Sequence, residues 1–310
     1  MAWILLATLG QFLAAIVVII DKYIVSDARA MPRPFVYAFY SCILTGGWVF
    51  IFMLGALPGF RELGFPHVSN LEIPSIQVVA MAFLAAYTFF MALVSMYSAL
   101  RDSEAIHVMP VIGTISALAS FGMSWLFLDT ALSLNFFLGV AILSVGMLLV
   151  AQSLPDWDAG LHVFHSGLFF ALHFVTMKGL FLETSFDDGF FWSRVAFVLF
   201  ALSLLLVPTY YKKIREQSSS TSTQTGLLVL LAKVLAGVSA FILLKATDWG
   251  DVAVVQALDA IKFAFVLLIS ILFASWLPDS AAVHESRPYE VVRRVLYIIL
   301  IVIGYFVLFL

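Results

Sequence analysis

Charged side chains are scarce in this chain. Asp, Glu, Lys and Arg make up 11% of its 310 residues, whereas 63% of the residues are hydrophobic. Soluble domains carry about 25% charged residues, so this composition excludes a water-facing surface over most of the chain. Basic tracts are lacking as well, and the net charge of −3 disfavours nucleic acid as a partner. The composition therefore predicts an integral membrane protein.

Cysteine is rarer still, since Cys42 is the only one. A single cysteine excludes an intrachain disulfide and a cysteine-based metal cluster, and its apolar surroundings predict a small packing residue. The N-terminal stretch also lacks the marks of a cleavable signal peptide. It has no basic segment at its start and no small-residue cleavage signature before Asp21. We therefore expect this stretch to be the first membrane span.

Apolar runs long enough to cross a bilayer recur along the whole chain, and the alternating short strands of outer-membrane barrels are not seen. The fold class predicted is an all-α integral membrane protein. Its ten transmembrane helices are expected at residues 2–24, 34–56, 74–99, 105–128, 132–152, 160–181, 189–210, 226–246, 252–277 and 291–310. The Ser/Thr-rich segment 216–225 has no apolar content to bury, so we expect a flexible loop there.

The two halves of the chain match each other weakly. An offset of 148 residues lays Tyr97–Ala105 on Lys245–Ala253, and at each of these junctions one predicted span ends and the next begins. A repeat with an odd number of crossings inserts upside down in its second copy. The pattern predicts two inverted five-helix repeats, at residues 1–153 and 154–310.

Four charged residues lie inside the predicted spans of the second half: Arg194, Lys233, Asp259 and Lys262. A charge at the bilayer centre costs about 2.5–3.5 kcal/mol, so it is normally kept only where it faces the protein interior, a partner or a water-filled path. We expect Asp259 and Lys262, three residues apart on one helix, to pair. Lys233 and Arg194 then leave a positive surplus that a bound anion would offset.

Each of these charges also has a purely structural interpretation. Arg194 is near enough to a predicted helix start to reach the lipid headgroups, and the two lysines can serve packing alone. Asp259 is either a fixed partner of Lys262 or a coupling group whose charge changes during function. Lys178, like Asp21 and Glu104, lies at a predicted helix end and is expected at the membrane interface.

Three histidines, His162, His165 and His173, lie roughly along one side of the predicted sixth span. His162 and His173 are about 16 Å apart along the helix, too far for one coordination sphere, so no metal site is predicted. His165 and His173 are candidates for the polar lining of a cavity, and interhelical hydrogen bonding is the alternative. In the fifth span, Gly139 and Gly146 are expected to permit close helix approach.

A resemblance to a known family rests on the segment Tyr97-Ser-Ala-Leu-Arg-Asp-Ser-Glu-Ala-Ile-His-Val-Met-Pro110, followed by Trp125-Leu-Phe-Leu-Asp129. It resembles the EamA-like transporters of the drug/metabolite transporter superfamily, in which a Tyr-x-Ala-Leu junction opens a helix that contains proline and ends in an acidic turn. Asp129 stands where glutamate is usual, and the second half has Leu258 at the proline position. The resemblance implies a central cavity lined by the first, third, fourth, sixth, eighth and ninth helices, with alternating access.

The sequence thus predicts a secondary transporter of a small metabolite, without enzymatic activity or a cofactor. No nucleotide-binding motif, His-Glu-x-x-His helix or Gly-x-Ser-x-Gly elbow is found. The Lys/Arg surplus favours a carboxylate or phosphate substrate. The expected partners are this small molecule, the lipid bilayer and a proton or sodium ion as coupling ion. A lipid flippase and a membrane sensor are alternatives on the same fold. The predicted substrate-binding residues are Arg194, Lys233, Asp259, Lys262, His165 and His173.

Lys and Arg residues are unevenly divided between the predicted loops. Loops after odd-numbered spans hold ten of them, and loops after even-numbered spans hold two, with Lys178 ambiguous at a helix end. This bias predicts that the odd loops are cytoplasmic and both termini lie outside. The family resemblance implies cytoplasmic termini instead. Either way we expect a multi-pass protein of the plasma membrane.

Overall fold

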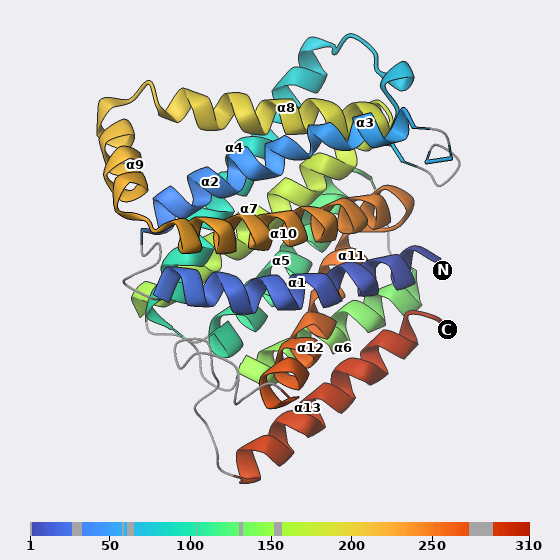
Figure 1. The fold of residues 1–310 in the computed structure, drawn as a ribbon. Helices are drawn as coiled ribbons and strands as arrows, with labels where there is room; N and C mark the ends of the chain where they lie inside the picture. Colours follow the sequence, from blue (N-terminus) through green and yellow to red (C-terminus); the bar gives the residue numbers. More distant parts are fainter. Residues whose placement is uncertain are drawn as a thin grey trace.

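The computed structural model describes residues 2–26, 33–57, 59–60, 65–103, 105–129, 133–151, 157–272 and 288–310. All regular secondary structure within these ranges is helical (Figure 1). The α-helices are α1 (Ala2–Ser26), α2 (Pro34–Gly46), α3 (Ile51–Gly55), α4 (Ile76–Asp102), α5 (Ala105–Phe127), α6 (Leu134–Ala151), α7 (Trp157–Glu183), α8 (Phe186–Leu204), α9 (Pro208–Ser220), α10 (Thr223–Trp249), α11 (Val252–Ala257), α12 (Asp259–Leu272) and α13 (Pro288–Val307). Two short 3-10 helices occupy Gly47–Phe50 and Val68–Asn70.

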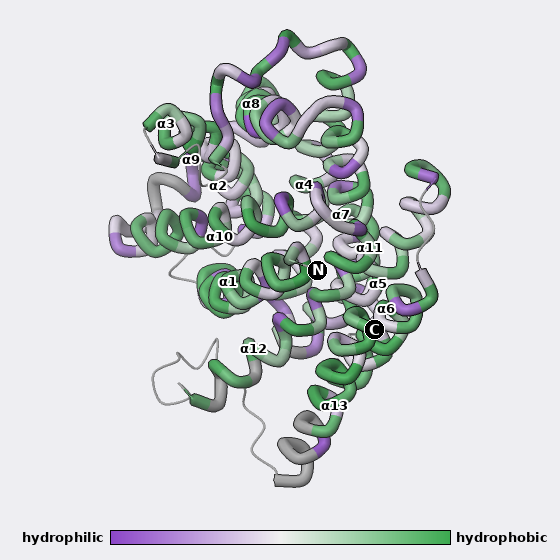
Figure 2. The backbone as a smooth tube through the Cα atoms, turned by 90° about the vertical axis from the view of Figure 1, so that its right-hand side faces the viewer, coloured by the Kyte–Doolittle hydropathy of each residue, from purple (hydrophilic) through white to green (hydrophobic). Residues whose placement is uncertain are grey.

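Among the described residues, six helices are long and apolar enough to cross a membrane, and a bent pair, α8 with α9, would make a seventh. Shorter apolar helices lie at 134–150 and 296–307. Large hydrophobic side chains on the outer surface are exposed, for example Leu5 at 61% and Leu231 at 60%. In Figure 2 the outer helices α1, α6 and α13 are mostly hydrophobic along their length. These features confirm a multi-pass, all-helical membrane protein.

The helices pack in pairs that join distant parts of the sequence. Helix α1 lies against α10, α4 against α7, and α6 against α13. Both termini lie at one end of the molecule and α9 at the other (Figure 1). Gly139 faces Leu308, just after α13, and Gly146 faces Ile301 of α13, where an added Cβ would lie 2.6 Å from Ile301 Cγ1. The predicted close approach at these glycines is therefore confirmed.

The segment that connects α8 to α10 differs from the prediction. The predicted seventh span ended at residue 210, but α8 ends at Leu204 and the chain bends by 99° into α9. The prediction of a flexible loop at 216–225 was wrong, because α9 continues to Ser220 and α10 begins at Thr223. The Ser222 hydroxyl accepts a hydrogen bond from the Thr225 amide at 3.1 Å, so a serine of this segment caps the next helix.

The predicted ninth span is broken. Helix α11 ends at Ala257, and α12 begins at Asp259 after the single residue Leu258. Asp251 caps α11 by accepting hydrogen bonds from the amides of Ala253 and Val254, at 2.8 and 3.3 Å. Burial raises the pKa of the Asp251 carboxyl, and these amides oppose that shift. The break places Asp259 at the first position of α12, where the Ile261 amide donates to the Leu258 carbonyl at 3.0 Å. Residues 273–277 of this predicted span lie outside the described residues.

Candidate functional site

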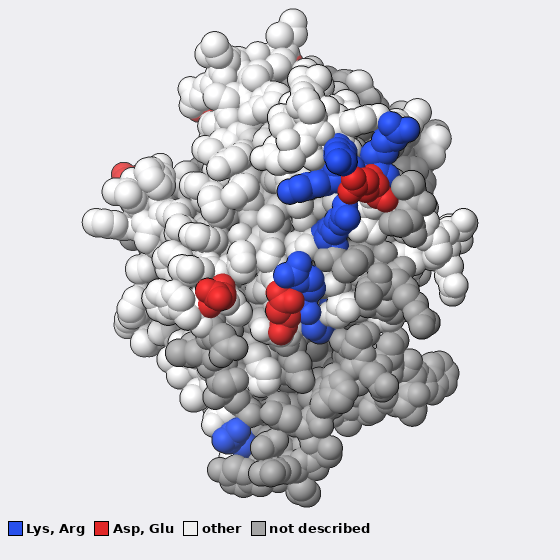
Figure 3. Space-filling view, turned by 90° about the vertical axis from the view of Figure 1, so that its left-hand side faces the viewer, with Lys and Arg blue, Asp and Glu red and all other residues white. Residues whose placement is uncertain are grey.

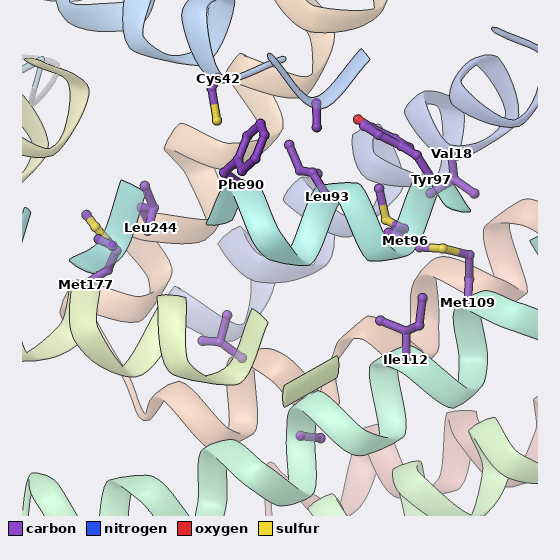
Figure 4. Packing of buried hydrophobic residues seen from close by; sticks show 14 of the residues in the cluster. Val18, Cys42, Phe90, Leu93, Met96, Tyr97, Met109, Ile112, Met177 and Leu244 are labelled. Carbon is purple, nitrogen blue, oxygen red and sulfur yellow. The ribbon is translucent and has the colours of Figure 1, made fainter. Parts of the chain in front are cut away.

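A cavity of about 180 Å³ lies inside the bundle. Residues of α1, α2, α4, α5, α7, α10, α11 and α12 line it. These are the helices that the family resemblance implied, with α2 in addition. Part of its apolar wall is visible in Figure 4, where Val18, Leu93, Met96, Met109 and Ile112 are labelled. Pockets for drug-sized ligands have about 300–1,000 Å³, so this volume suits a smaller solute.

The cavity wall also carries a group of polar side chains. Gln11 of α1 is 2% exposed, and its amide oxygen has no hydrogen-bond partner among the described residues. Ser116 of α5 donates to Gln256 of α11 at 3.0 Å. Such groups are costly inside a membrane protein unless they are satisfied by a partner, water or ligand. The polar lining residues are Gln11, Asp21, Ser41, Thr45, Tyr97, Ser116, Lys233, Ser239, Gln256, Asp259 and Lys262.

One buried ion pair joins α1 to α10 in the cavity wall. The Lys233 ammonium lies 2.9 and 3.1 Å from the two carboxylate oxygens of Asp21, and each residue is 3% exposed. Tyr97 of α4 accepts a hydrogen bond from Lys233 at 2.9 Å and donates one to Asp21 at 3.2 Å. Tyr37 of α2 also donates to Asp21. Four helices therefore meet at this pair, and every charged group in it has a partner.

This arrangement corrects two expectations. Asp21 was expected at a helix end near the membrane interface, but α1 continues to Ser26 and Asp21 is buried inside the bundle. Lys233 was expected to leave a positive surplus, but Asp21 neutralises it. The positive surplus was interpreted as a sign of a bound anion. Asp21 lies near the end of the predicted first span, but no pattern in the sequence related it to Lys233.

The second ion pair lies within α12 and was predicted. The Lys262 ammonium lies 2.7 and 2.8 Å from the carboxylate oxygens of Asp259, three residues earlier on the helix. The two side chains are 8% and 18% exposed, and both residues line the cavity. Gly113 of α5 faces this pair, because a Cβ there would lie 2.9 Å from Asp259 Oδ2. A glycine at this position leaves room for the carboxylate.

Arg194 is buried but does not line the cavity. It is 2% exposed, so it does not extend to the lipid headgroups. Its guanidinium carbon lies 4.7 Å from the ring centre of Phe190 and 4.5 Å from that of Phe197, in cation–π contacts. Its Nε donates to the Ser193 hydroxyl at 3.4 Å, and Nη2 has no hydrogen-bond partner among the described residues. Arg194 is thus held by aromatic rings of its own helix.

The two candidate histidines lie in different surroundings, and neither lines the cavity. His173 is 3% exposed, and its Nδ1 lies 2.9 Å from the Ala85 carbonyl oxygen of α4. For His173 the structure therefore shows an interhelical hydrogen bond, which was the predicted alternative to lining the cavity. His165 is exposed. In the described part of the chain, no group of three or more His, Cys, Asp or Glu side chains is placed to hold a metal ion.

Two lysines outside the cavity bind the ends of long helices. The Lys22 ammonium of α1 donates to the carbonyl oxygens of Leu100 and Ser103, at 2.7 and 2.9 Å, where α4 ends. The Lys178 ammonium of α7 donates to three carbonyl oxygens where α10 ends, at 2.9, 2.9 and 3.0 Å. A cation at a helix C-terminus satisfies the last carbonyl groups and the helix dipole. Glu104, grouped with Lys178 in the sequence analysis, lies outside the described residues.

The sequence matches no protein-family model. It also matches no curated protein. Among solved structures, a chain described only as "Crystal structure of protein" is similar over 97% of this chain and 95% of its own length. The identity is 16% and the TM-score is 0.60. At this identity the likeness concerns the fold alone.

Proposed function

We propose that the chain is a secondary transporter that moves a small polar solute through the central cavity by alternating access. One observation carries the proposal: two buried Lys–Asp pairs line a cavity inside a bundle of membrane-spanning helices. Four charges at such positions are costly, and pairs of this kind that line a cavity often mark solute or ion paths in membrane proteins. The proposal includes the expected absence of enzymatic activity and of a cofactor.

We further propose that the chain folds as ten spans in two inverted repeats, residues 1–153 and 154–310, as in EamA-like transporters. The two helix-binding lysines support this plan. Lys22 of α1 binds the Leu100 carbonyl of α4, and Lys178 of α7 binds the Asp248 carbonyl of α10. Leu100 and Asp248 are equivalent at the offset of 148 residues that relates the halves, whereas the two lysines are 156 residues apart and correspond by their places near the ends of α1 and α7. The contacts of α1 with α10 and of α4 with α7 are likewise exchanged by the repeat.

The ion pair between Asp21 and Lys233 would then connect the two repeats. Its residues belong to α1 in the first half and α10 in the second, so rocking of one repeat against the other would separate them. The pair between Asp259 and Lys262 belongs to one helix and would move as a unit. Asp21 freed from Lys233 would be able to bind the proton or sodium ion proposed as coupling ion.

The charge of the cavity lining restricts the charge that a bound substrate can carry. Its lining holds two lysines and two aspartates, so their formal charges cancel, and Arg194 is not part of it. A carboxylate or phosphate group of a substrate would therefore have to replace Asp21 or Asp259 as the partner of a lysine. We therefore propose an anionic substrate only if its charged group replaces one of these aspartates. Location in the plasma membrane stays a prediction.

A ligand screen by thermal shift in detergent tests the proposal. Carboxylates, phosphate monoesters, amino acids and organic cations would be compared on the wild type, on Lys262→Ala and on Lys245→Ala. Lys245 is the matched control, because it lies on α10 with Lys233 but is absent from the cavity lining. We expect one class to stabilise the wild type and Lys245→Ala but not Lys262→Ala. Stabilisation of all three proteins alike would contradict binding in the cavity. Co-purified lipid in place of a soluble ligand, seen by mass spectrometry, would favour the flippase alternative.

A further inference from the structure

The short helix α9 lies across one end of the bundle. The chain bends by 99° between α8 and α9, and Figure 1 shows α9 at the end of the bundle away from the termini. Because α8 packs against the membrane-spanning helices α2 and α4, a helix turned through this angle from α8 lies close to the plane of the membrane surface. Helix α9 is therefore placed where lipid headgroups meet water.

One face of α9 is attached to the protein. The Tyr210 ring lies 4.8 Å from the ring of Phe35 in α2, measured between ring centres. Ile214 and Gln217 are 6% and 7% exposed and follow Tyr210 at helical spacing. Arg33, just before α2, donates to the Lys213 carbonyl and to the Glu216 carboxylate, at 3.4 and 3.2 Å. These contacts fix the direction in which the other face points.

The other face is basic and exposed. Lys212, Lys213 and Arg215 are exposed, and the Lys212 side chain has a relative accessibility of 79%. Glu216 is the acidic residue among them, and Arg33 adds a further positive charge beside it. Figure 3, which looks onto this end of the molecule, shows several Lys and Arg side chains around an acidic one at the upper right, and a second group of charged side chains nearer the centre. The basic patch, defined as Arg33, Lys212, Lys213, Arg215 and Glu216, has four positive charges and one negative charge.

Apolar and aromatic side chains border the basic patch. Leu206 and Val207 at the bend are 83% and 41% exposed, and Tyr211 is 48% exposed. Exposed apolar groups next to a tyrosine and several basic residues are typical of the membrane interface. There the apolar groups enter the acyl region, and the basic groups meet headgroup phosphates. If the patch faced only water, its exposed apolar side chains would not be stabilised by contact with acyl chains.

We propose that the basic patch on α9 is a binding surface for anionic phospholipid headgroups. The patch has a net charge of +3 from four cations and one carboxylate. Juxtamembrane Lys and Arg clusters bind acidic lipids by this charge complementarity. Since the cytoplasmic leaflet carries the anionic lipids, the proposal also places the α9 end of the molecule at that leaflet and the termini on the opposite side. It is independent of whether the central cavity transports a solute.

Native mass spectrometry of the protein in uncharged detergent tests this proposal. Phosphatidylglycerol and phosphatidylcholine would be titrated in parallel, and apparent Kd values taken from the lipid-bound fractions. We expect the wild type to bind phosphatidylglycerol more tightly, and Lys212→Gln to weaken this binding about fivefold for the single charge removed. Glu216→Gln, which removes the acidic residue of the patch, should strengthen the binding.

The matched control is Arg101→Gln. Arg101 is exposed, lies at the C-terminal end of α4, does not belong to the basic patch and pairs with its own neighbour Asp102 at 2.9 Å. Its loss should leave the Kd unchanged. Equal binding of the two lipids by the wild type, or the same loss of affinity in Arg101→Gln and Lys212→Gln, would overturn the proposal. Competition by glycerol phosphate at the same concentration as the lipid would overturn it too, because the site would then recognise a free phosphate rather than a lipid.

Discussion

The two buried ion pairs of the cavity have the same chemistry but different connections. Asp21 and Lys233 are 212 residues apart and join α1 to α10, whereas Asp259 and Lys262 are three residues apart on α12. Tyr37 and Tyr97 reinforce the first pair from two further helices, and the second faces Gly113. The first pair thus restrains the two halves of the chain against each other. The second places charge at the cavity without restraining them.

Loss of Lys233 should give the largest effect. Lys233→Met leaves the Asp21 carboxylate buried without its cation, and breaking a buried pair in this way destabilises a protein by about 3–5 kcal/mol. We expect a markedly lower melting temperature in detergent than for Lys262→Met, because Asp259 is more exposed than Asp21.

The double variant Asp21→Asn with Lys233→Met is the control for that prediction. It removes both charges, so most of the stability should return. An equal loss in Lys233→Met and Lys262→Met, or no recovery in the double variant, would show that the two pairs do not differ as described.

The helix-binding lysines should give a smaller effect that is similar in the two halves. Lys22→Met and Lys178→Met each remove a partly buried cation from the C-terminal end of a long helix, and such a cation contributes up to about 2 kcal/mol. Thermal unfolding of the two variants in the same detergent checks this. Strong destabilisation by one substitution and none by the other would argue against equivalent roles in two repeats.

The smallest effect is expected at the glycine that faces the second pair. Gly113→Ala places a Cβ 2.9 Å from Asp259 Oδ2 and 3.0 Å from Met147 Sδ, so overpacking should cost about 1 kcal/mol or somewhat more. Gly122 on the same helix is the control, since no described atom lies within 4 Å of its added Cβ. Gly122→Ala should stabilise the helix by about 0.5–1 kcal/mol. If unfolding measurements showed both variants to be more stable than the wild type, or both to be less stable, the close packing described at Gly113 would be contradicted.

Local patterns in the sequence predicted much of this molecule. Apolar run length located the membrane helices, and spacing of three residues on a helix predicted the Asp259–Lys262 pair. The break at Leu258 was missed because neither proline nor glycine marks it. The helical continuation of α9 to Ser220 was missed because a polar segment can be held in a helix by attachment at Ile214 and Gln217.

Contacts between distant helices could not be predicted in the same way. The partner of Lys233 lies 212 residues away, and no local pattern relates them. His165 and His173 are separated by eight residues, which corresponds to about 80° around a helix, enough to put one outside and one inside. Polar side chains of α7 occupy both buried and exposed positions, as His173 and His165 show, so their polarity did not indicate which face of the helix is buried.

Solute counterflow in proteoliposomes measures directly whether the protein moves a solute through the charged cavity. The solute that stabilises the protein best in the thermal-shift screen would be loaded inside, and uptake of its labelled form measured for the wild type, Lys262→Ala and Lys245→Ala. We predict uptake above that of protein-free vesicles for the wild type and Lys245→Ala, and loss of uptake for Lys262→Ala. Uptake no greater than in protein-free vesicles, or equal uptake by all three proteins, would contradict transport through the charged cavity.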